Sequence, residues 1–459
     1  MKKLNIIYIG CLLALVSSCS DFLALKPDVK IATPETYADL RALLADEFTI
    51  NRFALGQLEM GVDDYFVPYS NWTALNAFNQ DMYLWKPDYL YLKDGLDDFW
   101  TSPYRPIAIA NIVLETLVRN KLEETQQGRQ LKGEALFIRS FQTFQLNLVF
   151  SPTYHSATAS TDLAPPLRLS SSIDLLSTRG SLAESYAQII TDLKEAERLL
   201  PERLEQLTRG SKFSVQALLA RIYLAMGDYP QALYYADAVL SAYPHLIDYN
   251  ELTTIDKVDP FPVMENPEVF YYATSFAGNR LIYSATANVD TVLYKSFSSD
   301  DLRKTAFFSQ RADGYQNFKG FYSGTEVSMF VGMATNELYL IKAECLMRLD
   351  KLQEGMDVLN QLLVKRWKTG TFTPYLVSDK ISTLKLLYAE RRKELIRRGL
   401  RWMDLKRLNK EPEFAKTLVR KMRIDGKEEI YELLPNDLRY VYLIPEDVIK
   451  YTGIPQNPR

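Results

Sequence analysis

Residues 213–244 constrain the fold more than any other segment, because their pattern predicts two short helices packed against each other. The segment reads FSVQALLARIYLAMGDYPQALYYADAVLSAYP, and Gly227 and Pro230 mark the break between the helices. With Ala232 at the close helix contact, the small and large apolar residues fall where a tetratricopeptide repeat places them. The segment therefore predicts a helical hairpin of that repeat type.

A weaker copy of this pattern occurs at residues 337–366, where Gly355 takes the place of Ala232. Two copies are fewer than the roughly three that a freestanding repeat array needs, so we expect them to pack on other helices. Residues 133–150 and 181–201 supply such helices, and Ser181 with Glu184 forms a capping box at the start of the second.

The segments 60–105 and 250–330 lack sustained periodicity and are rich in Tyr, Phe, Gly, Ser and Asn. We expect long ordered loops with a few short strands there, carried by the helices. The expected fold is mainly α. We expect the chain to consist of a signal peptide at 1–18 and a single domain at 19–459. Within this domain, repeat-like helices are expected at about 97–242 and 335–408. A loop-rich ligand face is expected at about 55–95 and 250–330.

The N-terminus has the order of a secretory signal peptide. Lys2 and Lys3 precede an apolar stretch at 4–16 that is too short to cross a bilayer core of about 30 Å. The small pair Ser17-Ser18 and then Cys19 resemble a bacterial lipobox, which predicts cleavage before Cys19 and lipid on its sulfur. The alternative is an ordinary signal peptide with an incidental cysteine. The first interpretation predicts attachment to a membrane through the N-terminal lipid.

Charge and residue usage exclude several classes of function. The chain has 54 basic and 57 acidic residues, a balance that gives no reason to expect nucleic acid as a partner. Cleavage removes Cys11 and lipidation uses Cys19, so Cys345 has no disulfide partner. The two histidines, His155 and His245, have no partner at metal-ligand spacing, and we expect neither metal nor cofactor.

The basic run at residues 391–407 is the strongest local concentration of charge. Glu390, Glu394 and Asp404 are interleaved with its arginines and lysines at pairing distance. We therefore expect a salt-bridged scaffold helix there rather than a surface for nucleic acid.

Aromatic residues are dense in the segment 60–105, where they alternate with carboxylates and amides. Phe99, Trp100 and Tyr104 open a helical stripe and are expected in the core. The candidate ligand-binding residues are Trp72 and Trp85 as stacking platforms and Asp64 and Tyr65 as polar partners. Tyr69 and Tyr89 share this loop, and Tyr283, Tyr294, Phe307, Tyr315 and Tyr322 form a second aromatic group without tryptophan. Such a mixture suits the apolar faces and polar rims of sugars, and it also suits peptides.

Besides residues 185–201 and 213–240, five segments carry a resemblance to a known family: Cys19 with SDFLALKP, GEALFIRSFQTFQLNLVF at 133–150, ENPEVFYY at 265–272, AERRKELIRRGLRWMDLKR at 389–407 and YLIPEDVIKYTGIPQNP at 442–458. These seven segments together resemble the SusD/RagB family of outer-membrane nutrient-binding lipoproteins, in family order and nearly end to end. Three positions depart from the family pattern: Ala334 stands where an Arg is usual, Arg398 where a Glu is common, and Cys345 replaces an Ala. These are scaffold positions.

The resemblance implies a SusD-like fold and a lipid-anchored, non-enzymatic protein of the outer membrane that faces the cell surface. It implies capture of an oligosaccharide and delivery to a SusC-type TonB-dependent transporter. The alternatives are the same transport role with peptide cargo and, from the adjacent carboxylates Asp63-Asp64 and Asp97-Asp98, a lipid-anchored glycan hydrolase.

Overall fold

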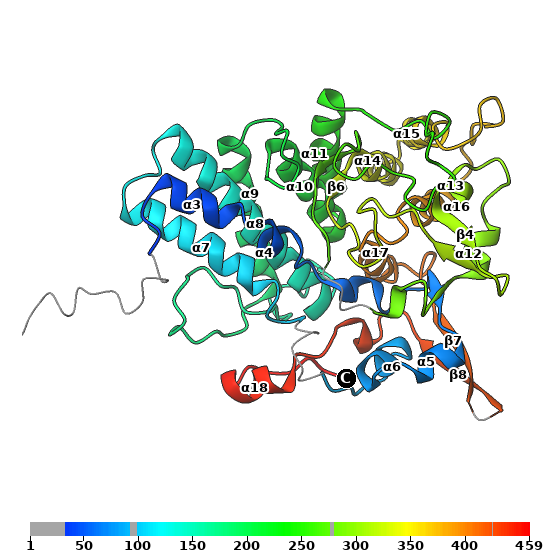
Figure 1. Cartoon of the computed structure of the whole chain (residues 1–459), viewed down its shortest axis with the longest axis horizontal. Coiled ribbons are helices and arrows are strands. Elements are labelled where there is room, and N and C mark those ends of the chain that lie inside the picture. Colours follow the sequence, from blue (N-terminus) through cyan, green and yellow to red (C-terminus); the bar gives the residue numbers. More distant parts are fainter. Residues whose placement is uncertain (1–32, 92–98, 276–279, 425) are drawn as a thin grey trace, which may run out of the picture.

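Helices packed side by side make up most of the protein, whose computed structural model describes residues 33–91, 99–275, 280–424 and 426–459 (Figure 1). Successive helices contact each other, as do α11 and α14, and the series runs across the upper part of the view. The series consists of α3 (Tyr37–Leu44), α7 (Tyr104–Arg119), α8 (Gln126–Phe150), α9 (Leu182–Leu199), α10 (Lys212–Met226), α11 (Tyr229–Ala242), α14 (Thr335–Arg348) and α15 (Leu352–Leu363). The prediction of a mainly α fold is confirmed. The predicted signal peptide and Cys19 lie outside the described residues.

Both predicted helical hairpins are present, α10–α11 and α14–α15. Gly227 ends α10 with φ +80°, a left-handed conformation that favours glycine, and Asp228 caps α11. Ala232 is fully buried at the helix contact. In the second hairpin, a Cβ on Gly355 would lie 2.7 Å from the carbonyl oxygen of Ala343, so α15 approaches α14 there as closely as a glycine allows.

The predicted helix after Gly180 is α9, and its capping box is formed. The Ser181 hydroxyl accepts a hydrogen bond from the backbone N–H of Glu184 at 3.2 Å, and the Glu184 carboxylate accepts one from the Ser181 N–H at 2.9 Å. The apolar face of α9 packs on α8 and α10. The scaffold helices therefore use their apolar stripes on one another, as the sequence predicts.

Short elements connect these helices and occupy the two segments expected to be loops. The helical ones are α4 (Glu47–Asn51), η1 (Gly56–Glu59), α5 (Tyr69–Thr73), α6 (Ala77–Tyr83), η2 (Arg280–Ile282), α12 (Thr291–Lys295), α13 (Arg303–Phe307), η3 (Leu438–Tyr440) and α18 (Glu446–Thr452). The strands form antiparallel pairs: β1 (Tyr65–Phe66) with β3 (Asn288–Val289), β2 (Val269–Tyr271) with β6 (Met333–Ala334), β4 (Phe308–Gln310) with β5 (Gln316–Phe318), and β7 (Leu418–Ile424) with β8 (Lys427–Leu433). Neither the short helices of these segments nor the β7–β8 ribbon was predicted.

The basic run forms two helices rather than the one expected. α16 (Lys380–Glu394) ends before the run is complete, and α17 (Arg401–Leu408) begins after a turn. Arg397 and Gly399 have φ values of +58° and +69° in this turn, which redirect the chain. The predicted ion pairs are present, for example Arg391 Nε to Asp404 Oδ2 at 2.8 Å.

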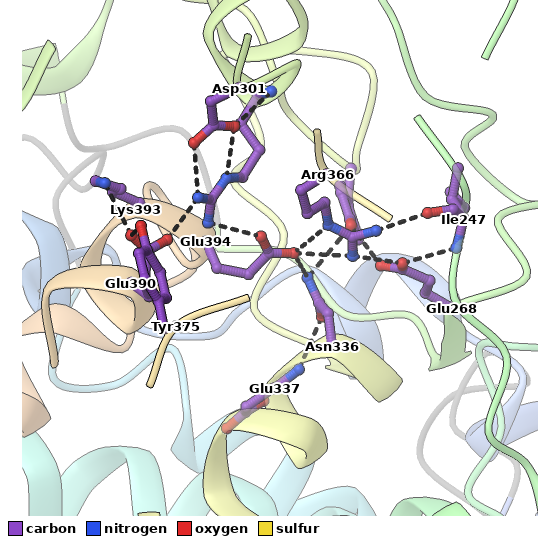
Figure 2. Close-up of polar contacts among 12 residues, drawn as sticks. Ile247, Glu268, Asp301, Asn336, Glu337, Arg366, Tyr375, Glu390, Lys393 and Glu394 are labelled. Atoms are coloured by element: carbon purple, nitrogen blue, oxygen red, sulfur yellow. Dashed lines mark hydrogen bonds and ion pairs between the residues drawn. The ribbon is translucent and has the colours of Figure 1, made fainter. Parts of the chain in front are cut away.

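A buried ionic network fixes the segment 247–303 to the scaffold (Figure 2). Arg366, which follows α15, contacts Glu268 and Glu394, and Arg303 contacts Asp301 and Glu390. Glu390 and Glu394 belong to α16, whereas Glu268 precedes β2 and Asp301 precedes α13. Long-range charge pairs therefore hold the irregular segments in place on the helices.

Candidate ligand-binding site

Two ring pairs come from residues 66–72 and from Tyr315, and together they are called the aromatic surface here: Phe66 with Tyr315, and Tyr69 with Trp72. Pro68 precedes α5, whose turn places Tyr69 and Trp72, three residues apart, on the same side. Their rings are stacked, with centroids 5.9 Å apart and an interplanar angle of 23°. Phe66 and Tyr315 meet edge to face at 5.1 Å. Tyr69 is 36% exposed and Tyr315 is 43% exposed, so the surface is open to solvent.

Hydrogen bonds to one short segment, residues 284–286, hold the two parts of the aromatic surface together. Asn71 of α5 donates from Nδ2 to the carbonyl oxygens of Ala285 and Thr286, at 3.1 and 3.0 Å. Arg311, in the β4–β5 hairpin, donates from Nη1 to the carbonyl of Ser284 and from Nε to Asp313 at 3.1 Å. These hydrogen bonds fix the positions of α5 and of the β4–β5 hairpin, which carry three of the four rings.

Trp72 lies half-buried on this surface. Its indole Nε1 donates to the carbonyl of Gln80 at 3.2 Å, and the Gln80 side chain donates back to the Trp72 carbonyl at 3.1 Å. These bonds lock α5 against α6. Because the indole N–H is used internally, Trp72 can offer a ligand its ring face, and its predicted role as a stacking platform stays a prediction.

Asp64 and Tyr65 lie inside the protein, contrary to the expectation that they contact a ligand. Asp64 is 2% exposed and accepts a hydrogen bond from Arg392 Nε at 2.8 Å. Tyr65 is buried, and its hydroxyl donates to the carbonyl of Met60. Burial raises the pKa of Tyr65 to about 12. Both side chains support the aromatic surface from below rather than forming part of it.

Trp85 is also a core residue, which corrects its predicted role as an exposed platform. It is 5% exposed, its Nε1 donates to the carbonyl of Gly61 at 3.0 Å, and the Arg420 guanidinium lies 4.3 Å from its ring centroid. Arg420 comes from β7, an element that the sequence analysis did not predict. The loop pattern around Trp85 therefore could not reveal that another part of the chain covers it.

Both carboxylate oxygens of Asp63 form ion pairs with basic side chains. Arg401 Nε lies 2.8 Å from its Oδ1, and Lys416 Nζ lies 2.6 Å from its Oδ2. Burial raises the pKa of Asp63, but Arg401 and Arg392 outweigh burial and hold this pKa well below its ordinary value. A carboxylate that stays ionised cannot be the proton donor that glycoside hydrolysis requires. Asp63 therefore does not fit the proton donor of a hydrolase, and Asp97-Asp98 lies outside the described residues.

Two further features bear on the site. The described residues include no group of three or more His, Cys, Asp or Glu side chains placed to hold a metal ion. In that same part of the chain, no helix is both long and apolar enough to cross a membrane.

Phe66, Tyr69 and Tyr315 were not among the four predicted binding residues. A signal for Tyr315 was present, because Asp313-Gly314 is a turn dipeptide, and Gly314 has φ +85° at the tip of the β4–β5 hairpin. A tyrosine beside such a tip is exposed. Tyr69 and Trp72 had the spacing of one helical turn, but the segment is too short for periodicity to be read.

The helical scaffold with short antiparallel strand pairs is a known protein fold. A SusD superfamily protein from Bacteroides vulgatus superposes with a TM-score of 0.74 at 21% identity, covering 92% of this chain and 99% of that chain. Another from Bacteroides thetaiotaomicron gives 0.73 at 20% identity, covering 92% and 100%. A structure described as a laminarin-binding SusD-like protein gives 0.66 at 19% identity, covering 92% and 99%. No curated protein matches the sequence.

The chain thus has the fold of the SusD superfamily structures. Residues 21–224 match the SusD-like family model described as "Starch-binding associating with outer membrane". The family match covers residues 21–224 and the fold likeness covers 92% of the chain, in agreement with the resemblance that the sequence motifs indicated.

Proposed function

We propose that this protein is a lipid-anchored carbohydrate-binding protein of the outer-membrane surface, that it binds oligosaccharide on the aromatic surface, and that it is not an enzyme. The observation that carries the proposal is the solvent-facing stack of Tyr69 on Trp72, beside Phe66 and Tyr315. Aromatic faces stack on the apolar C–H faces of sugar rings, and polar groups nearby bind the hydroxyls.

Polar groups suited to hydroxyls lie at the edge of the stack. The Nε and Nη1 groups of Arg311 donate hydrogen bonds to other residues of the protein. Its Nη2 has no hydrogen-bond partner among the described residues. The Tyr69 and Tyr315 hydroxyls belong to exposed side chains. The description of the family and the laminarin-binding neighbour of the same fold support carbohydrate as the cargo.

Delivery of the cargo across the membrane is the second part of the proposal. The proposal assigns this role to a SusC-type TonB-dependent transporter. Pull-down of the lipidated protein from membranes solubilised in mild detergent should recover an outer-membrane transporter. Recovery of none would contradict this part of the proposal.

A glycan array tests the binding function. The purified mature chain, residues 19–459 with Cys19→Ala, should bind at least one class of oligosaccharide and release no cleaved product. A peptide library in parallel tests the alternative cargo. Binding confined to peptides, or turnover of any bound glycan, would overturn the proposal.

A further inference from the structure

A groove of about 310 Å³ is lined by residues of α16, of α17 and of the segment 413–416. Its volume is at the lower end of the range of about 300–1,000 Å³ that is typical of small-molecule sites. Four cations and one carboxylate are among its lining side chains: Lys385, Arg392, Arg401, Lys416 and Glu413. The groove therefore presents a cationic wall.

The carboxylates of Asp63 and Asp64 hold the two guanidinium groups in place. Arg401 binds Asp63 through Nε and Nη2, at 2.8 and 3.0 Å, and Arg392 binds Asp64 through Nε at 2.8 Å. The side chains of Arg401 and Arg392 are 11% and 14% exposed. The Nη1 group of each donates to no described residue, so both present fixed N–H donors to the groove.

Lysines supply the remaining positive charge. Lys385 is exposed on α16 and makes no ion pair with a described residue. Lys416 is paired with Asp63, yet its side chain is 48% exposed. Planar guanidinium donors beside flexible ammonium groups are the combination that binds carboxylate, sulfate or phosphate oxygens in proteins.

The floor of the groove is apolar. Tyr388 and Phe414 meet edge to face with centroids 5.1 Å apart, and Leu405 and Leu408 line the same space. A ligand that fits both parts has an apolar ring face and an anionic substituent. Acidic sugars, which carry a carboxylate or a sulfate on a sugar ring, have both.

Two elements connect the groove to the proposed glycan site. Asp63, which anchors Arg401, precedes Phe66 by three residues of chain, about 10 Å if extended. Residues 413–416 lead into β7, which contacts α5, the helix that carries Tyr69 and Trp72 (Figure 1). The groove and the aromatic surface are therefore built on neighbouring elements.

We infer that this groove binds the anionic group of an acidic oligosaccharide, a uronate or a sulfated sugar. The inference rests on the proposed carbohydrate-binding function and narrows its substrate class. Charge makes the interaction sensitive to salt, since the screening length falls from about 10 Å at 0.1 M to about 3 Å at 1 M ionic strength.

The test is an array of uronate- and sulfate-bearing oligosaccharides printed beside their neutral parents, followed by titration of the best acidic ligand and its neutral parent. The expected result is preference for the acidic member, lost at high salt. Lys385→Glu should weaken acidic binding by about tenfold or more, the size of one charge-assisted hydrogen bond, and leave neutral binding unchanged. Lys194→Glu makes the same charge change at an exposed position of α9 and should leave both unchanged.

Each other outcome overturns the inference. Binding of neutral members alone, or equal binding of acidic ligand by the wild type and Lys385→Glu, rejects the anionic site and leaves the carbohydrate proposal intact. Binding of no glycan of either kind rejects both. Since Lys385 is an exposed side chain, a thermal melt that matches the wild type confirms that the variant is folded.

Discussion

Arg366 Nη2 lies 2.7 Å from Glu268 Oε1, and both side chains are completely shielded from solvent (Figure 2). The same arginine lies 2.9 Å from Glu394 Oε1. Glu268 also accepts hydrogen bonds from the Ile247 N–H at 2.9 Å and the Tyr322 hydroxyl at 2.6 Å. One buried pair thus connects the second helical hairpin, α16 and the irregular segment before β2.

Glu268→Ala should destabilise the fold strongly. Removing one partner leaves the buried Arg366 charge only partly compensated, a loss of about 3–5 kcal/mol in the free energy of unfolding. Denaturant unfolding measures this loss. Glu354→Ala breaks an exposed pair with Lys351 at 3.4 Å and is the matched control, expected to change stability by less than about 1 kcal/mol. Equal effects of the two variants would show that the network is not a stabilising link.

Overpacking the first hairpin tests the repeat assignment. Ala232 is fully buried where α11 meets its neighbours, so Ala232→Leu should lower the free energy of unfolding by about 1–3 kcal/mol. Ala242→Leu, at the exposed end of α11, is the control and should have little effect. An unchanged melt for Ala232→Leu would mean that this helix contact is wrongly placed.

We expect the free energy of unfolding to depend on pH through the carboxyl group of Glu59. It is fully buried, its Oε1 accepts a hydrogen bond from the Gly399 N–H at 2.8 Å, and burial raises its pKa to about 8 against the opposing charge of Arg397. The folded state therefore holds a proton that the unfolded state releases above its lower pKa of about 4.3. This carboxyl stabilises the fold less and less as the pH rises from about 4.3 to 8.

Glu59→Gln mimics the protonated carboxyl, so the variant should not lose stability through residue 59 as the pH rises. The measurement is the denaturant midpoint of both proteins at several pH values between 5 and 8.5. The variant should gain stability relative to the wild type toward the alkaline end. Parallel pH curves would contradict a protonated Glu59.

The lipid anchor has its own test. Cys19→Ala should leave the protein without lipid and released from membranes, because the cysteine sulfur is the predicted attachment point. Membrane fractionation of expressing cells, with mass spectrometry of the N-terminus, measures both effects. A Cys19→Ala protein that still partitions with the outer membrane in the absence of a transporter would contradict the lipobox interpretation.

Helix pairs could be predicted from the sequence because their determinants are local. The capping residues Ser181 and Glu184 are three positions apart, and the alanines at helix contacts recur at helical spacing. The binding surface depends instead on which rings other segments cover. Trp72 and Trp85 look alike in the sequence, but Arg420 of β7 covers only the second. Similarly, Arg392, which is distant in the sequence, donates a hydrogen bond to the Asp64 carboxylate. Whether these side chains are exposed depends on contacts with distant segments of the chain, so the local sequence pattern cannot predict it.

The affinity of Tyr69→Ala and Trp72→Ala for the best array glycan, measured by calorimetry, tests the account most directly. Each truncation should cost more than about 1 kcal/mol of binding free energy, and a cooperative thermal melt shows that each variant is folded. Trp72→Phe keeps a ring without the Gln80 hydrogen bond and should retain most of the affinity. Tyr234→Ala removes a tyrosine that is 63% exposed on α11 and should bind as the wild type does. Wild-type affinity in folded Tyr69→Ala and Trp72→Ala proteins would show that the aromatic surface is not the ligand site.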